Sequence, residues 1–218
     1  MRLQSAIFDM DGTLLDSMPT WRELGPTFLK EAGITATPEQ DRMLHILADC
    51  DVIPYLREVC GLPWSQQEII DQIIQRMETF YSSQVRPKPG LEKFLSILKM
   101  EGVWMYVATA THRRLTEKAL KTAGIDHYFR GIVPSADAGN HKSESADIYE
   151  MAMRRLQSNK RDTVVFEDAL HAIRTAKAAG FRVAGVYEAT AEQDQPEIQR
   201  LCDYYIRSYE ELVQSETF

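Results

Sequence analysis

Short apolar runs, each of which stops at a polar or turn residue, constrain the fold of this chain more than any other feature. They lie at residues 6–8, 105–108, 163–166, 182–186 and 204–206. Runs of this length are typical of strands that are buried on both faces of a sheet. Amphipathic helical patterns separate them, with apolar stripes at residues 91–98, 115–123, 148–156 and 172–179. The alternation predicts an α/β fold, in which a parallel sheet carries helices on both faces.

The stretch after the first apolar run has a different character, because it contains no convincing strand run. An amphipathic helical pattern at residues 21–32 is followed by two capping boxes, Thr37–Gln40 and Ser65–Glu68, which mark the starts of further helices. We therefore predict an all-helical domain inserted after the first strand. The predicted division of the chain is a helical cap domain of residues 17–84 and a core domain of residues 1–16 and 85–218.

The charge balance and the cysteines indicate which partners and which cellular location to expect. With 32 acidic against 25 basic residues, the formal net charge of −7 disfavours nucleic acid or a membrane surface as a partner. No apolar stretch approaches the ~20 residues that a membrane-spanning helix needs. The three cysteines form no CxxC pattern, which is typical of reduced thiols. Because Asp9 leaves no room before it for the apolar region of a signal peptide, we expect a cytoplasmic protein.

Polar residues follow three of the predicted strands at the point where each strand ends. Asp9 and Asp11 follow the first run, Thr109 follows the second, and Glu167 and Asp168 follow the third. Because ligands in open α/β folds bind beyond the carboxyl ends of the strands, we expect these side chains to converge on one site. One acid at a strand end is most simply a solvated loop residue. Four acids at two strand ends, beside a threonine, indicate a functional site.

The acidic residues of this site point to a metal and to phosphoryl chemistry. Close carboxylates repel one another and raise each other's pKa unless a cation neutralises them. An all-oxygen site with no histidine or cysteine pattern suits Mg²⁺. Gly12 permits a tight backbone path in the loop that carries Asp9 and Asp11. A carboxylate beside such a metal can act as a nucleophile and form an aspartyl-phosphate. Mg²⁺ is therefore the predicted cofactor.

Three segments of this constellation resemble motifs of the haloacid dehalogenase (HAD) superfamily. Asp9–Thr13 is similar to its first motif, Thr109 after an apolar strand to its second, and Phe166–Ala169 to its fourth. The resemblance spans nearly the whole chain. It implies a Rossmann-like core with an inserted helical cap, as in the β-phosphoglucomutase-like branch, and a phosphatase that acts on a small phosphorylated metabolite.

The resemblance also implies a role for each matching residue. Asp9 corresponds to the nucleophile and a Mg²⁺ ligand, and Asp11 to the general acid and base, whose backbone carbonyl also binds the metal. Thr109 corresponds to the hydroxyl that binds the phosphoryl oxygens. Asp168 corresponds to a further direct Mg²⁺ ligand, and Glu167 supports the metal directly or through water. Because the dehalogenases lack the second aspartate, Asp11 favours a phosphate substrate over a haloacid.

The third motif of the superfamily is a lysine, for which Lys142 is the best match. It precedes Asp147, where a helix is predicted to begin. Relatives often read Lys-Pro-x-Pro-Asp at this point, whereas this chain is one residue longer there and has no proline. Lys160 is the rival candidate, but it follows the helix and belongs to the next connection.

Other functions stand as alternatives to a hydrolase. Sugar phosphomutases of the same branch carry a histidine on the first cap helix, where this chain has Trp21, and a Gly-x-Ser-Arg stretch that is missing between Leu44 and Gly61. Both differences favour a hydrolase. A non-enzymatic phospho-acceptor also uses an acidic cluster, a threonine and a lysine, but such receiver domains are shorter and have no helical insertion. A HAD-like module that binds without catalysis is the remaining alternative.

Overall fold

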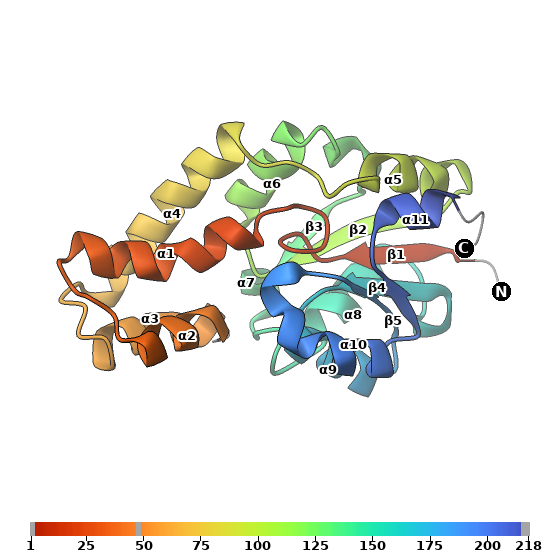
Figure 1. The fold of residues 1–218 in the computed structure, drawn as a ribbon. Coiled ribbons are helices and arrows are strands. Elements are labelled where there is room, and N and C mark those ends of the chain that lie inside the picture. Colours follow the sequence, from red (N-terminus) through yellow and green to blue (C-terminus); the bar gives the residue numbers. More distant parts are fainter. Residues whose placement is uncertain (1–2, 47–48, 215–218) are drawn as a thin grey trace. The chain divides into compact units, whose positions relative to one another are not determined.

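The computed structural model describes residues 3–46 and 49–214, which form two compact units (Figure 1). One unit, called the core, comprises the residues up to Asp16 and those from Tyr81 onward. The other, called the helical unit, comprises Ser17–Phe80. Among the described residues, no helix combines the length and the apolar character that crossing a membrane requires.

The core is built on a sheet that has six strands in the described part of the chain, and all neighbouring strands are parallel. The strands are β1 (Ser5–Phe8), β2 (Trp104–Thr109), β3 (Ile132–Pro134), β4 (Thr163–Glu167), β5 (Arg182–Val186) and β6 (Tyr204–Ile206). Their spatial order, β3-β2-β1-β4-β5-β6, is that of a Rossmann-like fold. The predicted α/β fold with a parallel sheet is confirmed.

The strand β3 is the one element of the sheet that the apolar pattern does not predict. Its three residues form too short a run to stand out between the helical patterns on either side. In the structure β3 pairs with the end of β2, where Thr109 lies opposite Pro134. This pairing covers the end of β2, so Thr109 is buried instead of lying at an open sheet edge.

Helices cover both faces of the sheet (Figure 1). On one face, α8 (Asp147–Arg155), α9 (Leu170–Ala178) and α10 (Gln195–Leu201) share an apolar cluster with the strands. On the other, α5 (Leu91–Met100) and α11 (Tyr209–Gln214) meet through Phe94 and Tyr209, and Phe94 also contacts Phe166 of β4. The remaining helical segments of the core are α6 (Arg113–Thr122), α7 (Ser135–Ala138), η1 (Asp126–Tyr128), η2 (Lys160–Asp162) and η3 (Ala189–Asp194).

The two central strands, β1 and β4, end side by side. They pair in register with Phe8 opposite Phe166, and the two rings stack with their centroids 4.3 Å apart. The backbone amide of Asp9 donates to the carbonyl of Phe166 at 2.9 Å, which extends the hydrogen-bonded ladder one residue past β1. Because the register is fixed in this way, the residues that follow the two strands must lie close together.

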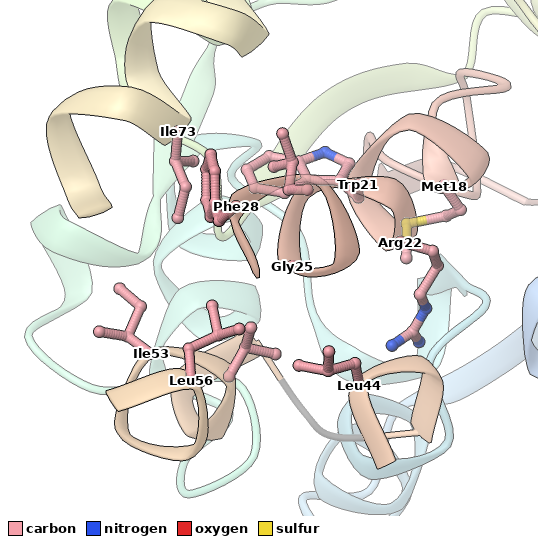
Figure 2. Close-up of a pocket in the computed structure, with 11 residues that line it drawn as sticks. Met18, Trp21, Arg22, Gly25, Phe28, Leu44, Ile53, Leu56 and Ile73 are labelled. Atoms are coloured by element: carbon pink, nitrogen blue, oxygen red, sulfur yellow. The ribbon is translucent and has the colours of Figure 1, made fainter. Parts of the chain in front are cut away.

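The helical unit consists of α1 (Met18–Glu31), α2 (Pro38–Ile46), α3 (Asp49–Glu58) and most of α4 (Gln66–Ser83), whose last turn belongs to the core. These helices enclose a pocket lined mainly by apolar side chains, among them Phe28, Leu44 and Leu56 (Figure 2). The pocket lies inside the helical unit, where the apolar faces of the four helices meet.

Both capping boxes predicted from the sequence are confirmed. The amide of Thr37 donates to Oε1 of Gln40 at 2.9 Å, and the amide of Gln40 donates to Oγ1 of Thr37 at 3.2 Å. Ser65 and Glu68 form the same reciprocal pair, at 2.7 and 3.2 Å. Each box satisfies two backbone amides at a helix N-terminus, which fixes where α2 and α4 begin.

Candidate active site

Three buried acidic side chains meet at the edge of the sheet where β1 and β4 end. Asp9 follows β1 directly, Glu167 is the last residue of β4, and Asp168 comes next. One carboxylate oxygen from each residue lies within 4.8 Å of those from the other two. We call these three residues the acidic cluster. Its members come together because β1 and β4 are paired in register.

Lys142 reaches the acidic cluster from the loop before α8. Its ammonium group contacts Oδ1 of Asp9 and donates to Oε2 of Glu167 at 3.0 Å, and 6% of its side chain is exposed. Lys160 lies elsewhere, because its ammonium group pairs with Glu150 at 2.6 Å and donates to the carbonyl of Ala179. Of the two lysines that the sequence offers for the third motif, the structure places Lys142 at the cluster.

The electrostatics of the cluster indicate a shortage of positive charge. Burial raises the pKa of Asp9 well above its usual range, and the charge of Glu167 adds to the effect. Burial also raises the pKa of Asp168 to about 8, again with a contribution from Glu167. Burial opposes the charged form of Lys142, but the carboxylates of Asp9 and Glu167 outweigh it and raise the pKa of that lysine. Since Lys142 offsets one of three negative charges, the cluster favours a further cation.

Asp11 lies outside the acidic cluster, in the turn that follows β1. Gly12 adopts a φ of 87° in this turn, a left-handed conformation that glycine tolerates best. The two carboxylate oxygens of Asp11 accept hydrogen bonds from two different hydroxyl groups. The hydroxyl of Tyr81 donates to Oδ1 at 2.6 Å, and that of Thr111 donates to Oδ2 at 2.7 Å.

Two buried threonines take part in the hydrogen bonds around these acids, Thr13 directly and Thr109 through Thr111. Thr109, the last residue of β2, is buried, and its Oγ1 accepts a hydrogen bond from the amide of Thr111 at 3.1 Å. Thr13 is also buried and donates its hydroxyl to Oδ1 of Asp168 at 2.7 Å. The bond from Thr13 fixes the orientation of the Asp168 carboxyl group within the cluster.

Comparison with known proteins identifies the family to which this arrangement belongs. Residues 6–186, which include Asp9, Asp11, Lys142 and the whole acidic cluster, match the sequence profile of the haloacid dehalogenase-like hydrolases. The chain belongs to this family.

Several HAD-like proteins of known name or structure are similar to the chain. It is 26% identical over 185 residues to the phosphorylated carbohydrates phosphatase of Thermotoga maritima, an alignment that covers 84% of this chain and 85% of that protein. It is 26% identical over 190 residues to the fructose-1-phosphate phosphatase YqaB of Escherichia coli, with coverage of 85% and 97%. The crystal structure of CbbY from Rhodobacter sphaeroides in complex with phosphate shares the fold, with a TM-score of 0.75 and 22% identity over 96% of each chain.

Some residues that hold the HAD-type side chains in place are not predicted from the sequence. Hydroxyl groups of other residues donate to Asp11 and Asp168, as described above. In the same way, the hydroxyl of Tyr149 donates to Oε2 of Glu167 at 2.7 Å. Closeness to a motif is the one available signal for three of them: Thr13 lies in the first motif, Thr111 follows Thr109 by two residues, and Tyr149 lies on α8 after Lys142.

Tyr81 carries no such signal. In the sequence it is one more member of the apolar stripe of the helix that begins near Ser65, and nothing local marks it as a partner of Asp11. The two residues are 70 positions apart along the chain. Their contact depends on α4 returning to the core, which no short pattern reveals.

Proposed function

We propose that this protein is a Mg²⁺-dependent phosphatase that hydrolyses a small phosphate monoester through an aspartyl-phosphate intermediate on Asp9. The observation that carries the proposal is the buried acidic cluster in contact with Lys142, at the carboxyl ends of the two central strands of a HAD-family chain. The relatives named for phosphorylated carbohydrates and fructose 1-phosphate support a sugar phosphate as the substrate class.

The acidic cluster fits Mg²⁺ in both ligand type and charge. Its donors are carboxylate oxygens, which are the ligands that Mg²⁺ prefers. Three carboxylates and one ammonium group leave two negative charges, which a divalent cation would balance. Asp9, Glu167, Asp168 and the backbone carbonyl of Asp11 would hold the ion. Bound there, Mg²⁺ would supply charge neutralisation for the phosphoryl group.

The chain's own residues account for each bond change of a two-step hydrolysis. The Asp9 carboxylate attacks phosphorus, and the bond to the leaving oxygen breaks as Asp11 gives that oxygen a proton. Asp11 then takes a proton from a water molecule, whose oxygen attacks phosphorus and breaks the bond to Asp9. The hydroxyl of Thr109 and the ammonium of Lys142 would stabilise charge on the phosphoryl oxygens. The products are an alcohol and inorganic phosphate.

We further propose that the helical unit serves as a cap for the core. A cap of this kind excludes bulk water from the reacting groups and restricts which phosphate esters reach them. The rest of the substrate beyond its phosphate group would then be selected by side chains of the helical unit.

Lys142→Ala is expected to lower kcat/KM for phosphate monoesters by about 10²–10³-fold, because it removes a positive charge that stabilises the transition state. The matched control is Lys160→Ala, which removes a lysine from an ion pair away from the acidic cluster. Phosphate release should be measured with Mg²⁺ present, and circular dichroism should show that both variants are folded. If Lys142→Ala is nearly normal and Lys160→Ala is inactive, the catalytic ammonium group belongs to Lys160 and the assignment of Lys142 is wrong.

A hydrolase is expected to release free phosphate and to need no bisphosphate activator. Trp21 supports this choice, because its indole can donate a hydrogen bond but cannot take a proton from a sugar hydroxyl. The assay incubates the protein with β-glucose 1-phosphate and catalytic glucose 1,6-bisphosphate, and follows both glucose 6-phosphate and phosphate. A parallel screen of sugar phosphates should identify a substrate. Efficient formation of glucose 6-phosphate with negligible phosphate release would identify a mutase instead.

A further inference from the structure

We propose that Tyr81 and Thr111 are positioning residues for Asp11, and that their hydroxyl groups hold its carboxyl group while it alternately gives and takes a proton. The inference rests on the proposed function, in which Asp11 is the general acid and base. It concerns two residues outside the motifs that carry the resemblance to the family.

The geometry gives each oxygen of Asp11 its own hydroxyl partner. Tyr81 lies in the last turn of α4 and donates to Oδ1 at 2.6 Å, while Thr111 lies between β2 and α6 and donates to Oδ2 at 2.7 Å. Both side chains are buried, and Tyr81 has no exposed surface. Because the two donors come from separate elements of the core, they fix the carboxyl group from two directions.

Thr111 is itself held in place by neighbouring threonines. Its amide donates to Oγ1 of Thr109 at 3.1 Å, and its carbonyl accepts a hydrogen bond from the hydroxyl of Thr116 at 3.2 Å. Thr116 lies on α6 and is fully buried. The loop that carries Thr111 is therefore preorganised, and the hydroxyl that meets Asp11 starts from a fixed backbone.

The chemistry of the two partners suits a group that changes its protonation state. A hydroxyl group can donate a hydrogen bond to a carboxylate and can also accept one from a protonated carboxyl group, simply by rotating its O–H bond. An ammonium group can only donate. Asp9 and Glu167 contact the ammonium of Lys142, and Glu167 also accepts a hydrogen bond from the hydroxyl of Tyr149. Each oxygen of Asp11 accepts from a hydroxyl group, so both of these partners can stay in contact with the carboxyl group as it gives and takes a proton.

A positioning role makes a prediction that a purely structural role does not make. Protonation of the leaving oxygen matters for a sugar alkoxide, whereas the nitrophenolate of p-nitrophenyl phosphate departs without a proton. Misplacing Asp11 should therefore lower kcat/KM for a sugar phosphate more than kcat/KM for p-nitrophenyl phosphate. Loss of a buried hydrogen bond that merely supports the fold would affect both substrates equally.

The experiment measures kcat/KM, with Mg²⁺ present, for p-nitrophenyl phosphate and for the substrate that the wild-type protein hydrolyses fastest among fructose 1-phosphate, glucose 6-phosphate and glycerol 3-phosphate. Tyr81→Phe and Thr111→Val should each lower the value for the alkyl phosphate by about 10- to 100-fold, the effect of a lost hydrogen bond to a charged group. The loss for p-nitrophenyl phosphate should be clearly smaller. Asp11→Asn should show the same selectivity with a larger loss, about 10²–10⁴-fold.

Two controls separate positioning from folding. Thr111→Ser keeps the hydroxyl and should retain most of the activity that Thr111→Val loses, which keeps the test decisive even if Tyr81→Phe folds poorly. Tyr205→Phe removes a tyrosine hydroxyl that donates to Gln195 at 2.8 Å and should leave both substrates unaffected. Equal losses for both substrates, or no loss, in the Tyr81 and Thr111 variants would overturn the positioning role. A wild-type protein that is inactive on every phosphate ester would instead refute the proposed function, and this inference with it.

Discussion

Asp9→Asn is expected to abolish phosphatase turnover, with a loss of about 10⁴-fold or more, while the fold is retained. An amide is a far weaker nucleophile than a carboxylate and a poorer ligand for Mg²⁺. Its size and shape match those of the aspartate, and Lys142 keeps its contact with Glu167. Because burial and neighbouring charges raise the pKa of Asp9, removing its charge should not destabilise the metal-free protein.

Phosphate release, thermal melting and trapping of the intermediate together test this expectation. Wild-type protein that is quenched in acid during turnover should carry a phosphoryl group that hydroxylamine removes, and Asp9→Asn should carry none. Asp126→Asn is a matched control, since Asp126 is an exposed acid on η1. Activity of Asp9→Asn within about tenfold of the wild type would exclude Asp9 as the nucleophile.

The sequence predicts the sheet well because burial on both faces leaves a clear local signature. The runs that become β1, β4 and β5 are apolar, short and bounded by polar residues, so their assignment needs no tertiary information. The edge of the sheet at which the acids lie follows from the same pattern, since parallel strands share one carboxyl edge. The sequence does not predict strand β3, because three residues carry too little periodicity and the strand forms by pairing with β2.

The side chains that hold the site together are harder to predict, because their contacts depend on the packed fold. In the sequence Tyr81 is one more member of an apolar helical stripe, and Tyr149 simply follows Ile148 at the start of a predicted helix. The structure shows that each uses its ring for packing and its hydroxyl for a buried acid, Glu167 in one case and Asp11 in the other. A buried tyrosine hydroxyl needs a partner, but the sequence does not reveal which acid provides it.

Removing divalent cations with a chelator is expected to stop turnover completely, and added Mg²⁺ to restore it. Ca²⁺ should inhibit, because it prefers more ligands at longer distances and would displace the phosphate from Asp9. The measurement is phosphate release in chelator, after addition of Mg²⁺, and with both cations present. Full activity in excess chelator would contradict the assignment of the acidic cluster as a metal site.

The same cation should also change how stability depends on pH, which gives a readout that is independent of catalysis. Without metal, burial followed by repulsion from Glu167 raises the pKa of Asp168 to about 8, far above the value of about 3.9 for an unfolded aspartate. Between these values the folded state binds more protons than the unfolded state. The stability that Asp168 contributes is therefore fully present below about pH 4 and is lost as the pH rises through about 8.

A divalent cation favours ionised carboxylates, so its stabilising effect should grow across this pH range. Melting temperatures in chelator should fall between about pH 5.5 and about pH 8, and saturating Mg²⁺ should raise them most at the upper end. Asp168→Asn removes the titrating group and a ligand, and should reduce both the fall and the effect of Mg²⁺. Glu192, an acid on η3 outside the cluster, provides the control variant Glu192→Gln, which should behave as the wild type does. If Mg²⁺ raises the melting temperature equally at about pH 5.5 and about pH 8, the cation does not bind at Asp168. Only an ion that competes with protons for the Asp168 carboxylate makes this rise depend on pH.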